Sequence, residues 1–144
     1  MWTKPYGKTG KDISAVSFGG MRFDHPEDLD ANAEVVLHAY NRGVNYFDTA
    51  PAYCGGKSEE IFGVAFEHMD PAKYYVSTKT FAATPDELRK DLETSLKRMK
   101  RDSVHFLHIW CITSLDVWHK RRDGGAVADA LTAREEGLVE HVVV

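Results

Sequence analysis

Three polar side chains stand near the ends of short apolar runs, and their types suit acid catalysis. Asp48 and Lys79 each end such a run, and Tyr53 lies in the loop five residues after Asp48. In folds that alternate strands and helices, the loops at the carboxyl ends of parallel strands carry the reactive groups. We therefore expect the three side chains to converge at one mouth of a sheet.

The three groups predict a proton donor. A lysine ammonium favours the phenolate form of a nearby tyrosine, so Lys79 is expected to lower the pKa of Tyr53 from its reference value of ~10. Asp48 would keep Lys79 charged and oriented. Such a phenol can protonate a carbonyl oxygen while a hydride reaches the carbonyl carbon. The residues alone also fit a structural ion pair beside a packed tyrosine, because such pairs perturb pKa values too.

The elements that position these residues alternate between strands and helices, which is typical of β-α units sharing a parallel sheet. A short hairpin is predicted over residues 1–14, and residues 115–125 are expected to form a loop. From their apolar periodicity we predict strands at 15–18, 45–48, 74–78, 104–112 and 139–144, and helices at 31–42, 58–70, 85–99 and 126–136.

Local signals mark the ends of these helices. Thr84, Pro85 and Glu87 are typical of an N-cap, a first-turn proline and a capping-box glutamate. Ser58 is expected to cap the second helix, and Gly43 is expected to follow the end of the first one.

Composition indicates a single soluble domain. The chain has 144 residues, 18 Lys and Arg against 22 Asp and Glu, and a net charge of −4. No basic stripe is present, which argues against nucleic acid or an anionic membrane as the main partner. The first residues lack the long apolar segment of a signal peptide or membrane span, so we expect a cytoplasmic protein.

The sequence does not predict a metal site. Two cysteines, Cys54 and Cys111, cannot form a metal tetrad by themselves and are expected to be reduced and buried. His105 and His108 have a zinc-like spacing, but residues three apart on a strand face opposite sides.

Longer motifs resemble the aldo-keto reductase superfamily, and the resemblance covers the whole chain in order. It rests on the second-strand signature at 43–53 (GVNYFDTAPAY) and 56–59 (GKSE), the third-strand lysine motif at 76–79 (VSTK), the third helix at 92–99 (LETSLKRM), the first-strand loop at 18–22 (FGGMR) and the opening hairpin at 8–10 (KTG).

The resemblance implies an α/β fold that is the N-terminal half of a TIM (β/α)8 barrel. About four βα units and a fifth strand are expected in one domain, 1–144, which begins with the hairpin at 1–14. A complete barrel of this kind typically needs about 250 residues, so the domain is expected to be truncated.

The resemblance also implies residue roles. Tyr53 would be the general acid, Lys79 the group that depresses its pKa, and Asp48 the partner of Lys79. The family's histidine falls at Trp110 here, and His108 lies two residues earlier on the same predicted strand face. His108 is therefore a candidate substitute, with a core histidine as the alternative, and Trp110 is expected to shape the substrate site.

The implied activity is reduction of a small carbonyl compound to an alcohol with NADPH or NADH. Gly20, Met21 and Asp48 are the expected cofactor contacts, while the family's phosphate-binding loops follow strands seven and eight, which this chain lacks. The branch that 108–112 (HIWCI) resembles has longer members with iron-sulfur motifs, and none is present here.

Open sheet edges predict self-association or a partner that completes the barrel. The alternative function is a catalytically silent half-barrel, acting as an interaction module or arising as a truncation product.

Overall fold

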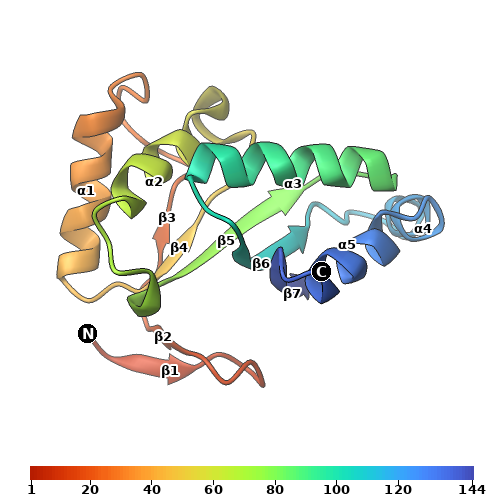
Figure 1. The fold of residues 1–144 in the computed structure, drawn as a ribbon, viewed down its shortest axis with the longest axis horizontal. Helices are drawn as coiled ribbons and strands as arrows, with labels where there is room; N and C mark the ends of the chain where they lie inside the picture. The colour runs from red at the N-terminus through yellow and green to blue at the C-terminus, as the bar shows by residue number, and fades with distance from the viewer.

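A five-stranded parallel sheet organises the chain (Figure 1). The computed structural model describes residues 1–144. The strands are β3 (Phe18–Gly19), β4 (Tyr46–Asp48), β5 (Tyr75–Thr80), β6 (Val104–Ile109) and β7 (Val139–Val143), and they lie side by side in chain order. Every neighbouring pair is parallel, so the carboxyl ends of the strands meet at one edge of the sheet. The α/β fold with a parallel sheet is confirmed.

Helices cover one face of this sheet, and a hairpin lies beneath it (Figure 1). The helices are α1 (Leu29–Asn41), α2 (Ser58–Phe66), α3 (Pro85–Met99), α4 (Leu115–Asp123) and α5 (Ala126–Glu135). Helix α2 packs against α1 and α3, and α5 packs against α3 and β7. The hairpin pairs β1 (Thr3–Pro5) with β2 (Asp12–Ser14) in antiparallel register. None of the helices has the length and hydropathy needed to cross a membrane.

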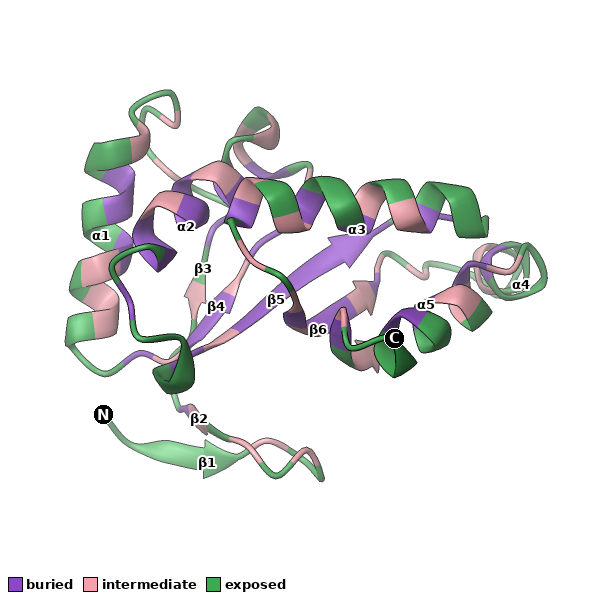
Figure 2. Cartoon of the chain, in the orientation of Figure 1, coloured by how far each residue is buried: buried purple, intermediate pink, exposed green.

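The hydrophobic core fills the layer between the helices and the sheet. Figure 2 shows buried residues on the strands and on the sheet-facing sides of α1, α2 and α3, with exposed residues on their outer sides. Aromatic rings form much of this layer near α2, where Phe62 and Phe66 stack and Phe66 also stacks on Tyr74. Burial of this apolar surface is the main term that holds the helices to the sheet.

The hairpin covers the face of the sheet that the helices leave open, near the amino-terminal ends of the strands. The Tyr6 ring packs edge-on against Tyr46 and Phe106, with ring centroids 5.5 and 5.1 Å apart. Lys11 also forms an ion pair of 2.6 Å with Glu140 in β7. The hairpin thereby keeps Tyr46 and Phe106 buried although no helix covers them.

The predicted cap of α3 and the glycine after α1 are confirmed. Thr84 accepts a hydrogen bond from the Glu87 backbone N–H, and the Glu87 carboxylate accepts one from the Thr84 N–H. Gly43 lies just beyond the end of α1 with φ of 90°. The predicted cap of α2 is wrong, because Ser58 is the first residue of that helix and its hydroxyl bonds Thr49 Oγ1 at 2.7 Å.

The bounds of several elements and one loop also differ from the predictions; α2, for example, ends at Phe66 rather than residue 70. The first sheet strand begins at Phe18 rather than residue 15, and β6 ends at Ile109, because Cys111 has φ of 63° and leaves the extended conformation. The segment 115–125, predicted as a loop, contains α4. Ser114 caps this helix by accepting a hydrogen bond from the Val117 N–H. Helix α4 has one buried residue, so its sequence lacks the apolar periodicity that predicts a helix.

Candidate functional site

An ion pair joins the carboxyl ends of β4 and β5. Lys79 Nζ donates to both oxygens of Asp48 at 2.7 Å, and to the carbonyl oxygen of Thr49 at 2.8 Å. The Lys79 side chain is 7% exposed and that of Asp48 is 28% exposed. The structure therefore brings together the two charged residues that the sequence placed at the ends of neighbouring strands, and one carboxylate edge still reaches solvent.

Two further groups that the sequence analysis missed hold this pair. Ser77 Oγ donates to Asp48 Oδ1 at 2.6 Å, and the Thr49 carbonyl accepts the third Lys79 hydrogen. Ser77 shares a strand face with Lys79 because side chains alternate along β5, so the period of two would have found it. The Thr49 contact uses the backbone and left no signal in side-chain types.

Tyr53 packs beside this ion pair. It begins a short 3₁₀ turn, Tyr53–Gly56, in which Cys54 and Gly55 adopt positive φ angles of 53° and 62°. The Lys79 ammonium lies 5.0 Å from the centroid of the Tyr53 ring, within the range of a cation–π contact. The three residues predicted to converge do so, with the ammonium against the ring of Tyr53 and its hydrogens directed to Asp48 and Thr49.

The pKa of Tyr53 shifts in the direction opposite to our expectation. Burial raises it above the usual tyrosine value, and the negative charge of Asp48 raises it further. Because Asp48 balances the charge of Lys79, little net positive potential is left to favour the phenolate. The phenol therefore holds its proton at neutral pH.

Trp110 and His108 occupy different parts of the site. The Trp110 ring meets the Tyr53 ring edge-on at 5.7 Å, and Lys79 Nζ lies 5.8 Å from its centroid. His108 pairs in register with Lys79 across the β5–β6 ladder, and its Nε2 is buried without a hydrogen-bond partner. Burial, and secondly the Lys79 charge, lower the pKa of His108, so the ring is neutral at pH 7.

The residues after β3 differ in what they can contact. The Gly20 N–H donates to the Asp48 carbonyl at 2.8 Å. A Cβ on Gly20 would come within 2.3 Å of Ser58 Oγ and 2.4 Å of Phe62, so close packing against α2 explains this glycine. Met21 is 50% exposed.

Both cysteines are free. Cys54 is partly buried and Cys111 is exposed, so the expectation that both are buried is wrong. Cys54 Sγ accepts a hydrogen bond from the Phe23 N–H at 3.4 Å, which ties the loop after β3 to the turn that begins with Tyr53. No group of three or more metal-ligating side chains of the His, Cys, Asp and Glu types is found.

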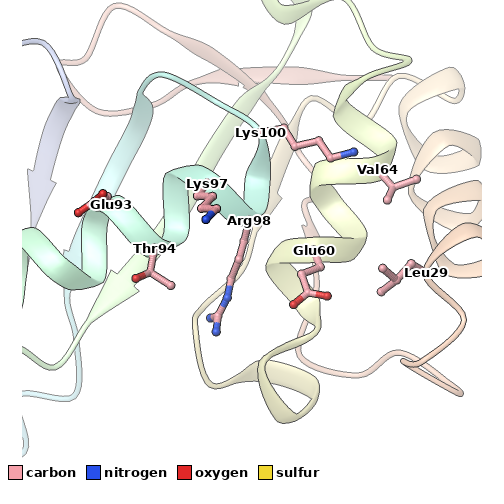
Figure 3. Close-up of a pocket in the computed structure, with 8 residues that line it drawn as sticks. All are labelled: Leu29, Glu60, Val64, Glu93, Thr94, Lys97, Arg98 and Lys100. Atoms are coloured by element: carbon pink, nitrogen blue, oxygen red, sulfur yellow. The ribbon is translucent and has the colours of Figure 1, made fainter.

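A separate hollow lies on the outer side of the helices. It has a volume of about 670 Å³ among α1, α2 and α3, and Figure 3 shows the residues that line it. Five of its eight lining residues are charged, and none is a residue that the sequence predicted for the site. It is lined by Leu29, Glu60, Val64, Glu93, Thr94, Lys97, Arg98 and Lys100. We assign the site to the strand ends because the ion pair and the phenol meet there.

Known proteins are similar to this chain in sequence and in fold. The Aldo/keto reductase family profile matches residues 15–144. An L-galactose dehydrogenase of Arabidopsis thaliana is 35% identical over 71% of this chain and 35% of its own length. A probable voltage-gated potassium channel subunit beta from the same plant is 32% identical over 75% of this chain and 37% of its own length.

A solved structure extends the match to nearly the whole chain. A putative aldo-keto reductase from Pseudomonas aeruginosa superposes with a TM-score of 0.79 and 25% identity, over 97% of this chain and 58% of its own. The chain thus spans little more than a third of the length of these curated relatives and about half of a solved barrel. The half-barrel fold is confirmed, and the chain belongs to the aldo/keto reductase family.

Proposed function

We propose that the chain carries the proton-donating machinery of a nicotinamide-dependent carbonyl reductase. The observation that carries this proposal is the Lys79 ammonium, fixed by both Asp48 oxygens and lying against the Tyr53 ring. Family membership supports the same general chemistry, oxidation and reduction.

Tyr53 is the general acid in this proposal. Its phenol is protonated at neutral pH and donates that proton to the oxygen of a small carbonyl substrate. Donation of this proton avoids a free alkoxide, and Lys79, paired with Asp48, lies against the Tyr53 ring and supports its position. Asp48 holds Lys79 in this orientation.

Part of a nicotinamide cofactor fits the residues present. Asp48 Oδ2 accepts only from Lys79, and the carboxylate is partly exposed, so it can accept from a hydroxyl such as that of a ribose. The exposed Met21 side chain lies on the loop after β3 and offers apolar surface to a flat ring. The cofactor, NADPH or NADH, supplies the hydride when bound. Gly20 contributes close packing beneath this surface.

Trp110 and His108 have distinct roles in the proposal. Trp110 contacts the Tyr53 ring and forms one wall for the substrate. His108 is neutral and has a buried nitrogen without a partner, so it can bond a polar group that enters from the side of the sheet opposite the helices.

Association is proposed for the open edge of the sheet. Strand β7 pairs only with β6, so its other side presents unpaired backbone groups. A second copy of the chain, or a larger partner, would satisfy them, and light scattering would measure the resulting mass.

The free cysteines suit the reducing cytoplasm, where we place the protein.

A second candidate function is a non-catalytic interaction module. Two observations favour this alternative. One relative carries the name of a channel subunit, and Trp110 stands where the resemblance places the family's histidine.

A turnover assay separates the two. The 144-residue chain is mixed with NADPH, and separately with NADH, and a series of aldehydes and ketones, while the absorbance of the reduced nicotinamide is followed. The reductase proposal predicts a loss of absorbance that requires the carbonyl compound. Absence of any carbonyl-dependent loss would overturn it and favour the interaction module.

A further inference from the structure

Arg121 is an unusual residue in an otherwise exposed helix. It is 7% exposed and is the one buried residue of α4, which follows β6 (Figure 1). Arginine is almost never buried unless its charge is paired. Here the partners of the guanidinium are a backbone carbonyl and an aromatic ring. A buried arginine held in this way indicates a specific geometric task.

The guanidinium joins the two loops that leave β5 and β6. Nη1 donates to the carbonyl oxygen of Trp110, the residue after β6, and Cζ lies 5.8 Å from the ring centroid of Phe81, the residue after β5. Trp110 lies beyond the strand, and the positive φ of Cys111 turns the chain away. Arg121 therefore supplies a donor for a carbonyl group that has left the β6 ladder.

The two loops carry a continuous aromatic contact that leads to Tyr53. The Phe81 and Trp110 rings lie 4.9 Å apart at 50°, and Trp110 meets Tyr53 at 5.7 Å and 89°. Phe81 is 48% exposed, and the side chains that contact its ring are those of Trp110 and Arg121. The planar guanidinium can lie with its flat face on a ring while its N–H groups bond a carbonyl, whereas a lysine ammonium has no flat face to stack.

We infer that Arg121 is a positioning residue that fixes the rings of Trp110 and Phe81 beside Tyr53. Through those rings it sets the shape of the apolar wall that selects the substrate. The effect on substrates rests on the proposed function, whereas the effect on the rings does not.

The test observes Trp110 directly. In a background with Trp2→Phe and Trp118→Phe, Trp110 is the one remaining tryptophan. Arg121→Met is compared with Arg121→Lys and with the control Arg122→Met, whose exposed guanidinium pairs with Asp123. Near-ultraviolet circular dichroism and quenching of Trp110 fluorescence by acrylamide are measured, with far-ultraviolet spectra as a check on folding.

We expect Arg121→Met to lose most of the Trp110 dichroism and to increase quenching at least twofold, with an unchanged far-ultraviolet spectrum. The Trp110 dichroism and quenching of Arg121→Lys should lie between those of the parent and Arg121→Met. Those of Arg122→Met should match the parent's. Equal Trp110 signals in Arg121→Met and Arg122→Met would overturn the inference. If Arg121→Met does not fold, the inference is tested on Arg121→Lys alone. A Trp110 signal in Arg121→Lys identical to the parent's would then overturn the inference.

A kinetic comparison separates the inference from the proposed function. If the chain turns over, Arg121→Met should raise KM for bulky carbonyl substrates about tenfold and leave kcat for a small aldehyde within about twofold. If the chain does not turn over, the Trp110 spectra still test the positioning role.

Discussion

Lys79 Nζ lies 5.0 Å from the centroid of the Tyr53 ring, while its hydrogens are directed to Asp48 and Thr49. The lysine thus supports the ring of the tyrosine and keeps its hydrogen bonds for the carboxylate and the backbone. Two opposite charges in contact leave a small net potential, so burial dominates the pKa of Tyr53. This arrangement leaves a neutral phenol above a fixed ion pair.

Removing the carboxylate charge of Asp48 should lower the pKa of Tyr53. The Asp48→Asn variant keeps the shape of the side chain and leaves the Lys79 charge unbalanced. The pKa of Tyr53 is therefore expected to fall, because the negative charge of Asp48 contributes to raising it and an unbalanced ammonium favours the phenolate.

Ultraviolet difference titration of Asp48→Asn against Asp48→Asn/Tyr53→Phe measures this pKa. Asp102→Asn, at an exposed site, is the control and should leave the titration of Tyr53 unchanged. A pKa in Asp48→Asn equal to or above the parent's would contradict the charge balance.

A methyl group on Gly20 should destabilise the fold, whereas one on Gly19 should not. A Cβ at Gly20 would lie 2.3 Å from Ser58 Oγ and 2.4 Å from a carbon of Phe62, but a Cβ at Gly19 meets nothing within 4 Å. Overpacking of this kind typically costs about 1–3 kcal/mol. Urea unfolding of Gly20→Ala and Gly19→Ala should show the loss of unfolding free energy only in the former. Equal midpoints would refute the packing role of Gly20.

Stability should depend on pH through His105. Burial, and secondly the charge of Arg101, lower the pKa of His105 from 6.5 to about 4. Between these values the unfolded chain binds the proton and the folded chain does not, so unfolding free energy falls as pH drops from about 6.5 toward 4. The ring is partly exposed, so screening by solvent limits the effect to on the order of 1 kcal/mol.

The variant His105→Asn tests this effect, because its amide oxygen can still accept the Val76 N–H that bonds His105 Nδ1. The difference between urea midpoints at pH 7 and pH 5 should shrink in His105→Asn. It should persist in the control His119→Gln, at an exposed position. An undiminished difference in His105→Asn would show that another group is responsible.

The sequence predicted the parts of the site that depend on repeating patterns. Asp48 and Lys79 end strands whose apolar runs are visible in the sequence, and parallel neighbours place such ends together. Helix α4 was missed because its one buried residue, Arg121, is charged and gives no apolar period. The direction of the Tyr53 pKa shift was missed because burial depends on packing between distant segments.

The replacement of Tyr53 by phenylalanine tests the central claim most directly. Tyr53→Phe removes the phenol hydroxyl and keeps the ring that contacts Lys79 and Trp110. Tyr75→Phe, at the opposite end of β5 from Lys79, is the matched control. With NADPH and a carbonyl substrate, turnover is expected to fall by roughly 10² to 10⁴ in Tyr53→Phe and to stay within about twofold in Tyr75→Phe. Unchanged turnover in Tyr53→Phe would contradict the assignment of Tyr53 as the general acid.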